Sequence, residues 1–196
     1  MDHALNRRRA YVLKPNIRER LLWPTPGVRL SALAADTSTG PFAGRLYFAC
    51  RERGAGRIVV NHAGDGREEW STPVSVGQAD AVAEERIPAI AVNNRGVVGV
   101  AWIDGRTAPG HRCEETVYFA VSLDGGETFS AHERISAITE ACPDNTLTDP
   151  TGGDYFGFAP APDGRFELLW AETRNGVTEL RRISVTIEGV VQAGGR

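Results

Sequence analysis

Short apolar runs separated by turn residues recur along most of the chain. Runs such as VVGVAW, TVYFAVS and FELLWA are rich in β-branched and aromatic residues, which favour strands. No stretch keeps a helical period over three turns, although residues 79–85 could form a turn or two of helix before Pro88. The pattern therefore predicts an all-β protein. The expected strands cover residues 30–36, 44–51, 56–62, 69–76, 87–93, 97–103, 116–122, 129–135, 154–160, 165–171, 178–186 and a last one near 189–193.

Two elements of this pattern are repeated, and the first repeat groups the strands. Residues 91–106 align without a gap on residues 159–174, and a weaker copy lies at residues 44–53. The aligned pairs are Ala91 with Ala159, Gly96 with Gly164, Trp102 with Trp170, Asp104 with Glu172 and Arg106 with Arg174. Each copy reads as strand, glycine turn and strand, which is the mark of a repeat architecture. The chain is therefore divided into an N-terminal extension (1–29) and a repeat region (30–196) with units at 30–77, 86–136 and 153–193.

The second repeat marks a turn within two of these units. SLDGGETFS at residues 122–130 is matched by AGDGREEWS at residues 63–71. An Asp-Gly pair between two extended runs predicts a hairpin, because glycine supplies positive φ and the aspartate can bond the turn amides. The aromatic residue that follows, Phe129 or Trp70, is expected to pack into the sheet. The turn is therefore a determinant of the fold.

The same residues resemble a known family. The pattern S-x-D-G-G-x-T-F from Ser122 to Phe129 resembles the Asp-box of bacterial neuraminidase repeat (BNR) proteins, the sialidase superfamily. RIPAIAV at residues 86–92 and GDYFGFAPAPDGRFELLWAETR at 153–174 are also similar to strands of that family. The resemblance covers about residues 30–186 and implies a β-propeller with one four-stranded sheet per blade. The structural Asp-box residues that it implies are Ser122, Asp124, Gly126, Thr128 and Phe129, and in the degenerate copy Asp65 and Trp70.

The number of blades leaves two alternatives. Sialidase propellers have six blades, closed propellers have about 4–8, and this chain accounts for about three. Either the sequence is part of a longer propeller, or two copies associate about a twofold axis as a homodimer that completes six blades.

The resemblance also implies candidate site residues. Sialidases use a tyrosine nucleophile with a glutamate base, an aspartate acid/base and three arginines that clamp the substrate carboxylate. Arg86, in the R-I-P motif, corresponds to the first clamp arginine, and Asp104 and Arg106 match the acidic residue and arginine on the next strand. Tyr155 is the candidate nucleophile, and Asp154 beside it is a candidate for a ligand-binding pocket on the axis.

Two observations weigh against catalysis by this chain alone. The Asp104-x-Arg106 pair recurs as Glu172-x-Arg174, and recurrence favours a packing role, since a catalytic residue should be unique. The loop at residues 107–116, where the acid/base aspartate is expected, contains no Asp. The substitutes there are His111, Glu114 and Glu115.

Composition and charge exclude other classes. The 196 residues carry 22 Lys and Arg against 25 Asp and Glu, so there is no basic surplus for nucleic acid. No apolar run approaches the ~20 residues of a membrane span. No secretory signal is expected, because Lys14, Pro15 and Arg18 interrupt the first apolar stretch. The cytoplasm is therefore expected for the chain as it stands, and an extracytoplasmic location for a longer chain with another start.

Cysteines and acidic residues add two open questions. Cys50 lies in an apolar strand and is expected to be a buried thiol, whereas Cys113 and Cys142 lie in loops and pairing between them stays open. No cofactor is expected, with one exception: the loop at residues 142–154 carries oxygen ligands of the kind that calcium prefers, although their spacing fits no known pattern. These ligands are Asp144, Asn145, Asp149 and Asp154.

The sequence therefore favours a sialidase-like protein, an exo-glycosidase or a binding protein for sialylated or other acidic glycans. The alternative is a noncatalytic propeller that acts as a scaffold for a protein or polysaccharide.

Overall fold

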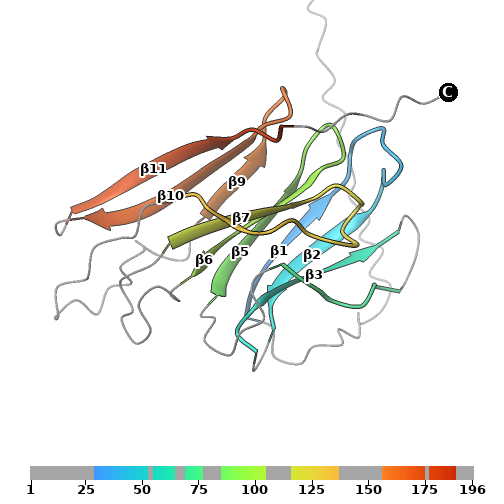
Figure 1. Cartoon of the computed structure of the whole chain (residues 1–196), viewed down its shortest axis with the longest axis horizontal. Coiled ribbons are helices and arrows are strands. Elements are labelled where there is room, and N and C mark those ends of the chain that lie inside the picture. Colours follow the sequence, from blue (N-terminus) through green and yellow to red (C-terminus); the bar gives the residue numbers. More distant parts are fainter. Residues whose placement is uncertain are drawn as a thin grey trace, which may run out of the picture.

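A computed structural model describes residues 29–52, 55–64, 69–76, 85–104, 116–136, 156–174 and 177–188. These residues form eleven strands in three antiparallel sheets and no helix (Figure 1). The all-β prediction is thereby confirmed for the described part of the chain. Within it, no helix is long and apolar enough to cross a membrane.

Each sheet is an up-and-down meander in which neighbours in sequence pair in space. The first sheet contains β1 (Arg29–Ala35), β2 (Leu46–Arg51), β3 (Ile58–Ala63) and β4 (Val74–Ser75). The second contains β5 (Glu85–Val92), β6 (Val98–Asp104), β7 (Thr116–Ser122) and β8 (Glu133–Arg134). The third contains β9 (Phe156–Pro160), β10 (Phe166–Arg174) and β11 (Val177–Val185).

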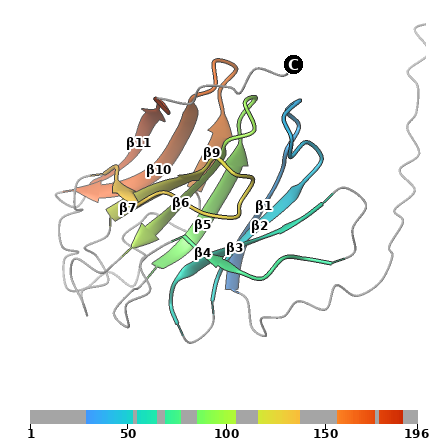
Figure 2. The ribbon, with the colours of Figure 1, turned by 45° about the vertical axis from the view of Figure 1, so that its right-hand side comes forward.

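The sheets stand face to face like the leaves of a fan (Figure 2). The first strand of each sheet, β1, β5 or β9, lies on the inner side of the fan, and the second sheet stands between the other two. Residues from all three inner strands line one shared hollow. This order is the reason why the middle sheet contributes to both hydrophobic cores.

The core has two parts, one on either face of the second sheet. Tyr47, Ile58 and Val60 of the first sheet pack with Val98, Val100 and Trp102 of β6. On the opposite face, Ala101 and Ile103 pack with Phe166, Leu168 and Trp170 of β10. All seven residues of β6 are buried, because successive side chains point to opposite faces and both faces are covered.

A glycine ends the first turn of every sheet. Gly44, Gly96 and Gly164 have φ of 83°, 75° and 89°, a region that residues with a Cβ rarely adopt. Each of these amides donates to the carbonyl of the residue that directly follows the preceding inner strand, namely Asp36, Asn93 or Ala161. The repeat read from the sequence therefore corresponds to a repeated strand–turn–strand unit.

The outer strands are shorter than expected. β4 covers only two residues of the expected 69–76, because Pro73 has no amide to donate to the ladder. β8 is likewise a two-residue ladder at the exposed edge of its sheet. The expectation of a helical turn at 79–85 is wrong at its last residue, because Glu85 opens β5, and residues 79–84 lie outside the described part. The extension up to residue 28 and the strand near 189–193 lie there too.

We predict that Trp102→Ala destabilises the fold by about 3–5 kcal/mol, the usual cost of truncating a buried tryptophan. The side chain is completely buried and its ring stacks on Tyr118 at a centroid distance of 6.0 Å. Urea unfolding measures this loss, and Leu123→Ala at a side chain that is 59% exposed is the matched control. Equal effects of the two substitutions would show that the sheets do not share this core.

Candidate functional site

A pocket of about 270 Å³ lies where the inner strands of the three sheets converge. It is lined by residues of β1, β5 and β9, so no sheet forms it alone. The lining residues are Ser31, Ala32, Ile87, Pro88, Ala89, Ile90, Phe156 and Phe158. They provide one hydroxyl, two aromatic rings and apolar surface, which suits the C–H faces of a ring-shaped ligand better than an ion. We call this hollow the axial pocket.

The wall formed by β5 is strained. Ile87 has φ of 49°, a region that a β-branched residue rarely adopts, and the register of β5 on β6 shifts between Arg86 and Ala89. The shift is a β-bulge, since three steps along β5 oppose two along β6. Strained backbone of this kind is typical of ligand sites. Nothing in the sequence signals this strain directly, although Pro88 restricts the residue that precedes it.

The bulge also decides where two buried carboxylates lie. Glu85 on β5 lies opposite Asp104 on β6 in the strand register, and both residues are fully buried. Oε2 of Glu85 accepts a hydrogen bond from the amide of Ile58, the first residue of β3. Oγ1 of Thr116 donates to the carbonyl of Asp104 at 3.3 Å. Glu85 thus ties the second sheet to the first, a role that the sequence did not indicate.

The structure brings together only some of the residues expected from the sequence. The backbone of Arg86 directly precedes the pocket wall, and its side chain is not among the described ones. Asp104 is buried opposite Glu85 and does not line the pocket. Several expected residues lie outside the described residues: Asp65, Arg106, His111, Cys113, Glu114, Glu115, Cys142, Asp154, Tyr155 and the whole 142–154 loop. In the described residues, no cluster of three metal-ligating side chains occurs.

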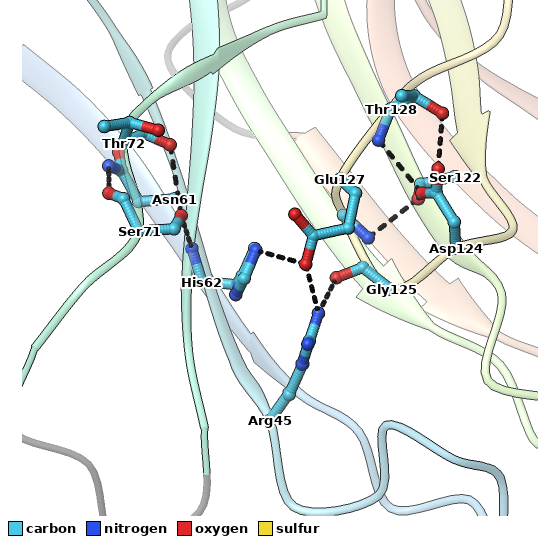
Figure 3. A network of polar contacts seen from close by, with 11 residues as sticks. Arg45, Asn61, His62, Ser71, Thr72, Ser122, Asp124, Gly125, Glu127 and Thr128 are labelled. Atoms are coloured by element: carbon cyan, nitrogen blue, oxygen red, sulfur yellow. Dashed lines mark hydrogen bonds and ion pairs between the residues drawn. The ribbon is translucent and has the colours of Figure 1, made fainter.

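Polar contacts concentrate instead on the 122–130 turn, which begins at the C-terminal end of β7 (Figure 3). Asp124 accepts hydrogen bonds from the Thr128 amide at 2.9 Å, the Thr128 hydroxyl and the Ser122 hydroxyl at 2.7 Å. The Gly126 amide in turn donates to the Ser122 hydroxyl at 2.8 Å. The Asp124 carboxylate is therefore bound within its own turn.

This turn is also fastened to the first sheet. Nη1 of Arg45 donates to the carbonyl of Gly125 at 2.6 Å and lies 3.2 Å from Oε1 of Glu127 (Figure 3). Nε2 of His62 lies 3.2 Å from the same oxygen. A Cβ on Gly125 would lie 2.5 Å from the ring of Phe42, so only glycine fits here. The Gly-Arg dipeptide at 44–45, repeated at 164–165, was the available sequence signal for this contact.

The matching turn of the first sheet shares part of this geometry. The amide of Ser71 donates to His62 as that of Ser130 donates to Val121, both at 2.8 Å. Each serine hydroxyl accepts a hydrogen bond from the same partner's amide, at 3.0 Å and 3.1 Å. Trp70 lies edge-on to Phe48 at a centroid distance of 6.2 Å, and Phe129 packs against the first core cluster. The aromatic residues therefore pack into their sheets.

Ionisable groups at the turn have shifted pKa values. Burial acts to raise the pKa of Asp124, but the hydrogen bonds from Thr128 and Ser122 outweigh it, so that this pKa lies below 3.8. Burial and the charge of Arg45 lower the pKa of His62 below 6.5, although Glu127 opposes the shift. His62 is therefore neutral in the folded protein at neutral pH.

Comparison with known proteins gives a fold. No family model and no curated protein matches the chain. Among solved structures, the Hadza microbial sialidase Hz136 matches with a TM-score of 0.57 at 15% identity, over 85% of this chain and 36% of that chain. The GH93 alpha-L-arabinofuranosidase of Fusarium graminearum, solved with arabinobiose, matches with a TM-score of 0.56 at 14% identity, over 82% and 46%.

The Penicillium chrysogenum alpha-L-arabinanase, also solved with arabinobiose, matches with a TM-score of 0.53 at 12% identity, over 85% of this chain and 48% of that chain. The chain thus has a β-propeller-like fold of the kind found in these glycosidases. It spans between about a third and a half of the length of the three chains.

We predict that Asp124→Ala destabilises the protein by about 1–3 kcal/mol, because the Thr128 amide and the Ser122 hydroxyl lose their acceptor. Ligand binding at the axial pocket should not change. Urea unfolding and a binding titration of the same variant separate the two effects. Unchanged stability with lost binding would contradict the structural role of this residue.

We further predict that stability falls as the pH is lowered below 6.5. His62 has a folded pKa below its ordinary value, so its contribution is complete above pH 6.5 and is lost as the pH falls through the folded pKa. Asp124 acts in the same direction, but only below its ordinary value of 3.8. Unfolding at about pH 7.5 and about pH 5.5 should show the loss, which His62→Gln should reduce. An identical pH dependence in the variant would rule out His62 as its source.

Proposed function

We propose that the chain is a glycan-binding protein of the sialidase-like type, with the axial pocket as its binding site. The observation that carries the proposal is the position of the pocket, which is built from the inner strands of three sheets and bounded by a strained bulge. Phe156 and Phe158 offer aromatic surface for a sugar ring, and the hydroxyl of Ser31 offers a hydrogen bond. The fold shared with a sialidase, an arabinofuranosidase and an arabinanase supports a glycan as the ligand.

The finer proposal is an acidic sugar. Arg86 stands next to the pocket wall in β5, and a guanidinium is the side chain best suited to bind a carboxylate in a bidentate manner. Hydrolysis by an exo-glycosidase mechanism would further require the groups carried by residues 105–115 and 137–155, which include Arg106, Asp154 and Tyr155.

A noncatalytic scaffold for a protein or polysaccharide is the second candidate. The described residues that line the pocket include no charged side chain, and Ser31 is the one hydroxyl among them. Such a lining favours binding over proton transfer. Failure to bind any sugar at the pocket, together with retained folding, would favour this function.

We predict that Arg86→Ala weakens the binding of N-acetylneuraminic acid by roughly tenfold or more, the loss of one charge-assisted pair. Isothermal titration calorimetry measures the change, and Arg86→Lys should retain part of the affinity. Arg134→Ala, at an exposed arginine of β8, is the matched control and should bind as the wild type does. Neither substitution should change the affinity for arabinobiose, because this sugar carries no charge. Equal losses for Arg86→Ala and Arg134→Ala would overturn the acidic-sugar proposal.

A further inference from the structure

The two described joints between sheets follow one rule. In the joint of the first two sheets, Tyr47 of β2 lies in one core cluster with Val98 of β6. In the next joint, Ala101 of β6 lies in one cluster with Phe166 of β10. The second strand of the middle sheet, β6, therefore turns one set of alternate residues to the sheet before it and the other set to the sheet after it.

The same rule assigns a neighbour to each outer sheet. In β10, Phe166 and Leu168 are buried against the second sheet, so Glu167 and Leu169 point to the side where a following sheet would stand. In β2, Tyr47 points to the second sheet, so Leu46 and Phe48 point away from it. The residues of the third-sheet face are Glu167, Leu169, Ala171, Leu180, Arg182 and Ser184. Those of the first-sheet face are Leu33, Ala35, Leu46 and Phe48.

Exposed apolar side chains gather on these two faces. Among the described residues, six large hydrophobic side chains are exposed, and four of them belong here. Leu169 and Leu180 of the third-sheet face are 44% and 74% exposed, and Leu33 and Leu46 of the first-sheet face are 62% and 39% exposed. Further along the first sheet, Cys50 is buried, so the open part of its face lies beside the turn that carries Arg45. These leucines lie on the two faces that the packing rule leaves without a described neighbour, where a docked sheet would cover them.

The polar contact between the first two sheets also has a counterpart. Arg45, which follows Gly44, binds the turn of the next sheet through Gly125 and Glu127. Arg165 follows Gly164 in the same way, and its side chain is 44% exposed and pairs with Asp163 of its own turn at 2.8 Å. In the sequence of the 63–71 turn, Glu68 occupies the position of Glu127. The third sheet thus presents an arginine, and the sequence of the first sheet offers the matching acid.

We propose that the third-sheet face of one chain docks on the first-sheet face of a second copy. The contact is made in both directions about a twofold axis, so that two chains close a ring of six sheets. The interface continues the packing rule of the two joints within the chain. The second copy would close the open side of the axial pocket, but the interface does not depend on what the pocket binds.

The test is the solution mass of the purified chain by light scattering. The wild type should have twice the mass of one 21.2 kDa chain. Leu169→Glu and Leu33→Glu should each give monomers, because each places a charge in both joints of the dimer. Leu123→Glu, at a leucine 59% exposed outside both faces, is the matched control and should remain dimeric. Circular dichroism confirms folding; where a variant fails it, Leu180→Glu replaces Leu169→Glu, and Leu46→Glu replaces Leu33→Glu.

Mixing Leu169→Glu with Leu33→Glu tests the direction of docking. A mixed dimer keeps one joint in which both faces are unaltered, so dimers should reappear in the mixture although neither variant forms them alone. A monomeric wild type, a ladder of larger masses, or a mixture without dimers would overturn the proposed ring. A dimer that binds no sugar would refute the proposed function alone, and a monomer that binds sugar would refute the ring alone.

Discussion

The fold depends on sheets that bury both faces. All seven residues of β6 are buried, whereas an antiparallel sheet in many proteins turns one face to water. A sheet of this composition is stable only between two others. The third sheet packs against one described sheet, the second. Leu168, on the covered face, is 1% exposed, whereas the adjacent Leu169, on the other face, is 44% exposed. The same strand pattern thus gives a closed core on one side and an apolar surface on the other.

A single extra residue in β5 connects this packing to the axial pocket. Because side chains alternate with a period of two, one added residue moves every earlier residue of the strand to the opposite face. The bulge at Ile87 therefore sets Glu85 opposite Asp104. There the Glu85 carboxylate accepts a hydrogen bond from the amide of Ile58. The positive φ of Ile87 costs about 1–3 kcal/mol, which the burial of its side chain offsets. One irregularity shapes the pocket wall and fastens two sheets.

The sequence predicted what repeats and missed what occurs once. Trp102 and Trp170 were aligned by a glycine turn and a strand pattern, and both are buried at equivalent positions of β6 and β10. The bulge in β5 occurs once and has no such pattern. The contact of Arg45 with Glu127 joins residues that are distant in sequence, and only the packing of whole sheets brings them together. The role of Glu85 and the residues that line the axial pocket could not be inferred for the same reason, although the resemblance implied a pocket on the axis.

The position of the 122–130 turn explains why it is a poor candidate for chemistry. Register pairs Thr116 with Asp104 at one end of β7 and Ser122 with Val98 at the other. The turn follows the Ser122 end of β7, whereas the axial pocket is lined by β5, two strands away in the same sheet. The Asp124 carboxylate is occupied by donors of its own turn, and Arg45 fixes that turn to the first sheet. The turn therefore serves the contact between the first two sheets and not the pocket.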